Sequence, residues 1–252
     1  MDMKLKEKFI ESWVKYFGSA ELPITFYYSD APGSADIVKP SEGWSCLIGE
    51  LNKVRNGKAL CFAHDSIGCF GGKRYLGFAT ELSEGFEYFL SYGIPGKLEG
   101  ERYKKTPELV KKIVENQPRL QAPGKYIIFK RWDALDAADE PAAVIFYARP
   151  DVLSGLFTLA GFNEDEPSAV HAPFSAGCGS IVQYPYLESM KDKQKCIIGM
   201  FDVSARPCVQ PDILTFSAPM KKFAEMVGNM DESFLITPSW DKVKKRIEKA
   251  GK

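Results

Sequence analysis

The six cysteines of this chain are the residues that offer it the most chemistry. Thiolate sulfur is a ligand for zinc, iron–sulfur clusters and copper(I). The sequence contains no Cys-x-x-Cys pair, so such a site has to draw its ligands from separate strands and loops. We predict a transition metal, an iron–sulfur cluster or a small redox cofactor as the bound group. The predicted metal ligands are Cys46, Cys61, Cys69 and Cys178.

The same cysteines also fit a purely structural role, because a free cysteine behaves as a small buried apolar residue. Under this second hypothesis the protein is a small-molecule-binding module or a non-redox enzyme, and its apolar strands and aromatic residues wall a pocket. A third hypothesis is a protein-interaction scaffold. The sequence holds no known catalytic motif, so whether the chain is an enzyme stays open.

The segment CFGGKR, residues 69–74, and Arg206 are the predicted elements for binding an anion or cofactor. Gly71 and Gly72 can expose backbone N–H groups, and Lys73 brings positive charge beside them. Arg206 can form a forked pair with a carboxylate or a phosphate. The spacing matches neither a Walker A motif nor a dinucleotide-binding fingerprint. A Gly-Gly turn between two strands and a solvated arginine are therefore the simpler interpretations.

The composition limits the classes of partner. Lysine plus arginine and aspartate plus glutamate number 33 each, so the global charge gives no reason to expect a nucleic-acid partner. No run of about 18 apolar residues occurs, and the N-terminal segment mixes charges into an apolar pattern. We therefore expect a cytoplasmic protein with a small-molecule ligand and no membrane partner. The oligomeric state is not fixed by the sequence.

Helical and strand patterns alternate along the chain, which predicts an α+β fold with a mixed or antiparallel sheet flanked by helices. A helix is expected at residues 5–17, and another begins at Thr106, an N-cap followed by proline. Residues 44–54 are expected to form a strand or buried segment. Residues 59–78 are expected to form a strand–turn–strand unit. Further strands are expected at residues 22–28, 125–135 and 141–150.

Several of these signals occur twice. SAGCGSIVQ parallels GWSCLIGEL, QKCIIGM parallels KALCFAH, and RPCVQPDILTF parallels IGCFGGKRYLGF. The corresponding cysteines are Cys46 and Cys178, Cys61 and Cys196, and Cys69 and Cys208. We therefore predict one globular unit over residues 1–252, built by internal duplication from two pseudo-equivalent halves, 1–120 and 121–252. Ligands favour the seam between such units, so the cysteine site is expected there.

The ordered cysteines, the glycine turn and the arginine also carry a family resemblance. The residues concerned are Cys46, the Cys69-x-Gly71 turn leading to Leu76-Gly77, Cys178 and Arg206. Over nearly the whole chain, this pattern resembles the family catalogued as domain of unknown function 169, found mainly in archaea and anaerobic bacteria. The resemblance implies a compact cytosolic protein with recurring cysteines and a suspected metal or redox role. Cys196 and Cys208 are additional to that pattern.

Overall fold

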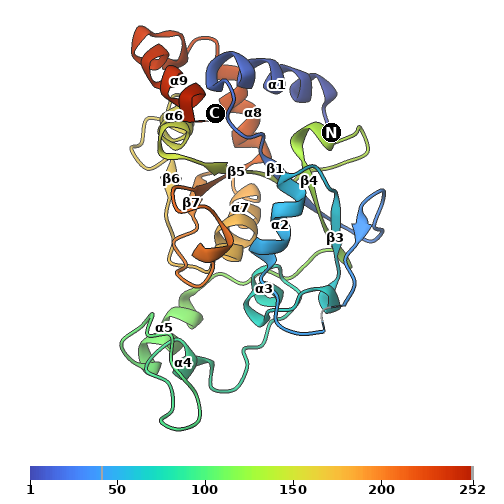
Figure 1. Ribbon diagram of the computed structural model, residues 1–252, viewed down its shortest axis with the longest axis vertical. Helices are drawn as coiled ribbons and strands as arrows, with labels where there is room; N and C mark the ends of the chain where they lie inside the picture. The colour runs from blue at the N-terminus through green and yellow to red at the C-terminus, as the bar shows by residue number, and fades with distance from the viewer. Residues whose placement is uncertain (41, 251–252) are drawn as a thin grey trace.

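One mixed sheet forms the middle layer of the fold (Figure 1). The computed structural model describes residues 1–40 and 42–250; Ser41, Gly251 and Lys252, which belong to the predicted globular unit, lie outside the described residues. Within the described part, eight strands form the sheet in the order β2-β3-β4-β1-β5-β8-β7-β6. The strands are β1 (Ile24–Ser29), β2 (Asp36–Ile37), β3 (Leu60–Phe62), β4 (Tyr126–Arg131), β5 (Ala143–Ala148), β6 (Val170–His171), β7 (Cys196–Gly199) and β8 (Leu214–Pro219). The pairs β2·β3 and β6·β7 are parallel, and the other pairs are antiparallel. The predicted α+β class with a mixed sheet is therefore confirmed.

Long helices cover one face of the sheet. They are α1 (Met3–Phe17), α6 (Pro150–Ala160), α8 (Met220–Asn229) and α9 (Pro238–Ala250). Their aromatic side chains meet over the central strands: Trp13 stacks on Phe17 with ring centroids 4.2 Å apart, and Phe9 lies edge-on to Phe223 at 5.0 Å. Each large apolar side chain that is fully buried contributes about 1.5–3 kcal/mol. This aromatic core therefore fixes the helices that lie above the sheet in Figure 1.

Shorter helical segments cover the other face. They are α2 (Leu47–Arg55), α3 (Phe70–Tyr75) and the π-helix η3 (Gly179–Gln183), which continues into α7 (Tyr184–Ser189). The remaining helices, α4 (Phe86–Phe89) and α5 (Pro107–Asn116), lie at the bottom of Figure 1, far from α9. Period-two alternation divides the central strands between the two cores. On β5, Phe146 faces the aromatic core, while Ile145 and Tyr147 face α2 and α7.

Two segments differ from the sequence predictions. Residues 44–54 contain the helix α2, whose buried residues Leu47, Ile48, Leu51 and Val54 recur at helical spacing. Of the two alternatives expected there, a strand or a buried segment, the strand is therefore wrong. Residues 59–78 form β3 and then α3, not two strands joined by a Gly-Gly turn. The sulfur of Cys69 accepts a hydrogen bond from the Gly72 N–H at 3.2 Å, which caps α3 and satisfies a first-turn amide.

The helix starts and the apolar strands were predicted more closely. The helix α1 covers the expected residues 5–17. The helix α5 begins after Thr106, whose hydroxyl accepts a hydrogen bond from the Leu109 N–H at 3.3 Å. The strands β1, β4 and β5 lie within or close to the three apolar segments predicted as strands. These elements have local signals, namely a cap or a short apolar run, that tertiary contacts do not override.

The two halves of the sheet share one strand order. Counted outward from the centre, one side is β1, β4, β3, β2 and the other is β5, β8, β7, β6. The strand β4 follows the predicted boundary at residue 120 along the chain, and it pairs with β1 and β3 on the first side of the sheet. The two Thr-Pro helices are not in equivalent positions, since α5 precedes β4 whereas α9 follows β8.

The packing of α6 against α1 and α9 gives a stability prediction. A Cβ at Gly155 would overlap the Trp240 ring and lie 2.9 Å from Cε1 of Phe17. We expect Gly155→Ala to lower the free energy of unfolding by about 1–3 kcal/mol, because overpacking a filled core is destabilising. Gly228 in α8 is the matched control: it has no atom within 4 Å of its added Cβ. Gly228→Ala should raise the free energy of unfolding by about 0.5–1 kcal/mol. Urea unfolding measures both, and equal effects would contradict this packing.

Candidate functional site

A cavity of about 670 Å³ lies between the α2–α3 region, the α4 segment and the loops that follow β6 and β7. Its lining includes Cys46, Cys69 and Cys178, three of the four predicted metal ligands. All three pack against the core beneath α2 and η3. The structure thus brings together cysteines that come from separate segments of both halves of the chain, as the absence of a tight cysteine pair required.

Aromatic side chains surround this cavity. The aromatic residues that line it are Trp44, Phe70, Tyr75, Phe86, Phe89, Tyr103, Phe174 and Phe201. Several are unusually accessible for their size: Trp44 is 76% exposed, Phe201 55% and Phe174 46%. Single exposed apolar residues are common, but a group of them around one concave surface marks a place where a ligand or partner binds.

The cysteines of the cavity lie at the starts of helices. Cys46 is the N-cap of α2, Cys69 is the N-cap of α3, and Cys178 directly precedes η3. The N–H groups of Gly72 and Leu47 both point to the sulfur of Cys69. A Cβ at Gly72 would lie only 2.8 Å from that sulfur, so the tight approach of α3 to its cap requires glycine.

A fourth cysteine joins this group, and the sequence analysis left it out of the predicted site. Cys208 ends the short helix η4 (Arg206–Cys208), and its thiol lies close enough to Cys46 for the two groups to interact. The side-chain amide of Asn52 donates to the Cys208 carbonyl at 3.1 Å, which holds η4 against α2. Cys208 was the predicted counterpart of Cys69, so each half of the chain contributes two cysteines to the group.

The remaining two cysteines lie elsewhere. Cys61 on β3 packs with Ala35 and Ile128, on the sheet face opposite the cavity. Cys196 on β7 is buried in the aromatic core on that same opposite face. The structure therefore does not bring Cys61 to the other predicted ligands, because strand alternation turns its side chain away from them.

Burial disfavours the thiolate form of Cys69, Cys178 and Cys208. Removal from water raises the pKa of Cys69 and of Cys178 above that of a free thiol, and it raises the pKa of Cys208 to about 11. At Cys69 the N–H groups of Gly72 and Leu47 lower the thiol pKa, but burial raises it by more. In residues 1–40 and 42–250, no group of three His, Cys, Asp or Glu side chains is arranged to hold a metal ion. The described side chains therefore do not fit a single metal ion, and the metal ligands stay a prediction.

The predicted anion-binding residues are dispersed. Gly71 and Gly72 line the cavity as parts of α3, but Lys73 and Arg206 do not line it. The Arg206 guanidinium donates to the carbonyls of Ile213, Gln210 and Pro211, the last at 2.6 Å. Arg206 thus closes the loop between η4 and β8, and its donors are used by backbone oxygens.

Asp202 organises the wall of the cavity and had no signal in the sequence. Its Oδ1 accepts hydrogen bonds from the hydroxyls of Tyr103 at 3.0 Å and Ser204 at 2.8 Å, and its Oδ2 accepts from the Gly177 N–H at 3.2 Å. The carboxylate therefore ties together three segments that are distant in sequence. The same wall begins at Met200, whose φ of 70° is disfavoured for a residue with a side chain.

Tyr147 is a second residue that sequence reasoning missed. Its hydroxyl is buried and has no hydrogen-bond partner within the described residues. Burial, with the nearby Cys178 and Cys46 adding to it, raises the pKa of Tyr147, so the phenol stays protonated. The guanidinium of Arg55 lies 4.3 Å from the ring centroid, held there by a pair of hydrogen bonds to Glu21. An unpaired donor therefore lies next to the cysteine group.

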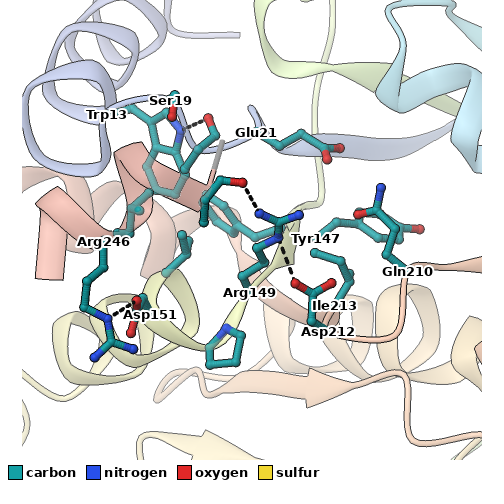
Figure 2. A pocket seen from close by; sticks show the side chains of 16 residues that line it. Trp13, Ser19, Glu21, Tyr147, Arg149, Asp151, Gln210, Asp212, Ile213 and Arg246 are labelled. Carbon is teal, nitrogen blue, oxygen red and sulfur yellow. Dashed lines mark hydrogen bonds and ion pairs between the residues drawn. The ribbon is translucent and has the colours of Figure 1, made fainter. Parts of the chain in front are cut away.

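A second cavity, of about 410 Å³, lies near the start of α6 and the end of α9 (Figure 2). Its charged side chains are paired with one another: Arg149 with Asp212 and Arg246 with Asp151, each at 2.9 Å. Glu21, which also lines it, is paired with Arg55 at 2.6 Å. Because these charges are already compensated, the cysteine cavity is the stronger candidate site.

Comparison with known proteins shows the family of the chain. The sequence model of the family DUF169, described as uncharacterised ArCR, matches residues 14–229. The chain belongs to the DUF169 family. The matched residues include all eight described strands and every residue that lines the cysteine cavity. No curated protein and no solved structure matches the chain. No described helix is both long and apolar enough to cross a membrane.

The unpaired hydroxyl of Tyr147 gives a mutational prediction. We expect Tyr147→Phe to raise the free energy of unfolding by about 1 kcal/mol, because a buried donor without a partner is costly. The matched control is Tyr27→Phe, which removes the hydrogen bond from the Tyr27 hydroxyl to Asp139 and should cost about 1.5–3 kcal/mol. Denaturant unfolding measures both variants. A loss of stability in Tyr147→Phe would show that its hydroxyl has a partner.

The raised pKa of Cys208 gives a pH prediction. Burial disfavours the thiolate, so the reactive fraction is small at neutral pH and grows until the pH passes about 11. The rate of Cys208 alkylation by iodoacetamide should rise about tenfold per pH unit between pH 7 and pH 10. Peptide mass spectrometry after timed alkylation measures this rate. A plateau at or below pH 9 would contradict the assignment.

Proposed function

We propose that this DUF169 protein binds a small, largely apolar organic molecule in the cavity lined by Cys46, Cys69 and Cys178. The observation that carries the proposal is the combination of volume and lining. A cavity of about 670 Å³ falls within the usual range of small-molecule sites, about 300–1,000 Å³. Its wall exposes aromatic rings that a folded chain otherwise buries.

Binding is better supported than thiol catalysis. A catalytic cysteine needs a lowered thiol pKa or an adjacent base. Burial instead raises the thiol pKa of Cys69 and of Cys178. Neither His64 nor His171 is among the residues that line the cavity in the described part of the chain. Cys69 and Cys178 therefore serve as a polarizable, uncharged part of the wall.

A soft metal or an iron–sulfur cluster is the second candidate. Cys46 interacts with Cys69, Cys178 and Cys208, so four thiols lie in one neighbourhood. Four cysteines are the usual ligand set of such clusters. This candidate ranks second because the described side chains do not form a three-ligand set as they stand.

We also infer that the chain arose by internal duplication. The shared strand order of the two sides of the sheet supports this, as do the positions of Cys46 and Cys178 at the starts of α2 and η3. Cys61 and Cys196 likewise lie on β3 and β7, which are equivalent strands under this order. The cytoplasmic location and the expected lack of nucleic-acid and membrane partners stay predictions.

A variant that fills the cavity tests the proposed function. Gly71 lines the cavity, and an added Cβ there meets no atom within 4 Å, so Gly71→Leu can enter the space without disturbing α3. Compounds that stabilise the protein in a thermal-shift screen should bind Gly71→Leu at least about tenfold more weakly, a loss of about 1.4 kcal/mol. The matched control is Gly228→Leu in α8, remote from the cavity lining. Ligands with unchanged affinity for Gly71→Leu would contradict the proposal.

Metal analysis separates the two candidates. If the thiols only line a ligand cavity, anaerobically purified protein should carry no stoichiometric metal and no visible absorbance. Replacing Cys46, Cys69 and Cys178 with serine should then leave the spectrum unchanged. The matched control replaces Cys61 and Cys196, which lie on the other sheet face. Iron-type absorbance that is lost only in the triple variant would favour the cluster instead.

A further inference from the structure

The charged residues that line the cysteine cavity all have one sign. They are Glu84, Glu101 and Asp202, and no lysine, arginine or histidine of the described chain lines the cavity. Asp202 is engaged by Tyr103, Ser204 and Gly177. By contrast, Glu84 and Glu101 are exposed, and neither makes an ion pair within residues 1–40 and 42–250. Two carboxylates are therefore free to meet a ligand.

Building on the proposed function, we infer that the cavity selects an organic cation: an ammonium group carried on an aromatic or alkyl body. The carboxylates carry the negative charge that attracts a cation, and the faces of the aromatic rings carry partial negative charge that attracts it as well. A cation over an aromatic ring is attracted by its quadrupole, and rings that surround a quaternary ammonium group are a common use of this attraction. Burial raises the pKa of Cys69 and of Cys178, so these two thiols stay neutral and the carboxylates supply the charge of the lining.

One ring of the cavity already illustrates this interaction. The ammonium of Lys104 lies 3.7 Å from the centroid of Phe174, although Lys104 itself does not line the cavity. Elsewhere in the lining, Phe86 and Phe89 of α4 have ring centroids 6.5 Å apart, and Glu84 lies two residues before Phe86. Rings and a carboxylate therefore come from the same short segment of chain.

The charge of the lining also argues against an anionic ligand. Anionic ligands, phosphate esters among them, would face three carboxylates with no lining cation to compensate them.

Three probes of matched size test the inference. Phenyltrimethylammonium carries a fixed positive charge, tert-butylbenzene has the same shape without charge, and benzenesulfonate carries a negative charge. Trp44 is a suitable reporter, because it lines the cavity and is 76% exposed, whereas Trp13, Trp132 and Trp240 are buried. The cation should quench or shift its fluorescence with an affinity at least about tenfold above that of either other probe.

The double variant Glu84→Gln, Glu101→Gln locates the effect. It should weaken phenyltrimethylammonium about tenfold and leave tert-butylbenzene unchanged. The control Glu81→Gln, Glu99→Gln removes the same charge from exposed neighbours that do not line the cavity, and it should change neither affinity.

The outcomes distinguish this inference from the proposed function. Equal affinity for the cation and benzenesulfonate, or an unchanged cation affinity in the double variant, overturns charge selection. Binding of tert-butylbenzene that is lost in Gly71→Leu would still uphold the cavity as a ligand site. If none of the three probes binds, the cation inference fails, and the thermal-shift screen decides the proposed function separately.

Discussion

The antiparallel pairing of β1 with β5 is the contact on which the rest of the molecule depends. It places Ile24 opposite Ile145 and joins the two sides of the sheet. Because β5 and the paired residues 24–26 of β1 are buried, helices must cover the sheet above and below. The pairing also sets α2 and η3 on the same face. The residues that directly precede them, Cys46 and Cys178, consequently reach one cavity.

The cavity is formed mainly by the starts of helices and by loops, and the described sheet strands do not line it. Three helix starts supply the thiols, and loops supply the rings and carboxylates. Asp202 ties the loop after β7 to Tyr103 and Gly177, so the wall is held by hydrogen bonds. Helix starts favour negative charge, but burial of the thiols outweighs this and keeps the sulfur uncharged. The lining of the cavity is therefore mostly apolar, and its charged residues are all acidic.

The sequence predicted the parts of this arrangement that have local signals. The cap of α5, the apolar strands and the order of the cysteines were visible, and with them the three cysteines that line the cavity. The Gly-Gly helix at residues 70–75 was not, because its stability comes from the Cys69 cap and from buried Tyr75. Cys208 and Tyr147 were missed for a related reason. Their roles arise only when η4 docks on α2 and Arg55 covers the Tyr147 ring, and both contacts are long-range.

The most direct test of the central claim is a crystal structure of the protein soaked with a compound from the thermal-shift screen. The claim is that thiols from both halves line one ligand cavity. We predict ligand density between Cys46, Cys178 and Phe174, with no movement of α2 or η3. Density in the cavity of paired arginines near Arg149, or on an open surface, with the cysteine cavity filled by its own side chains, would contradict the account.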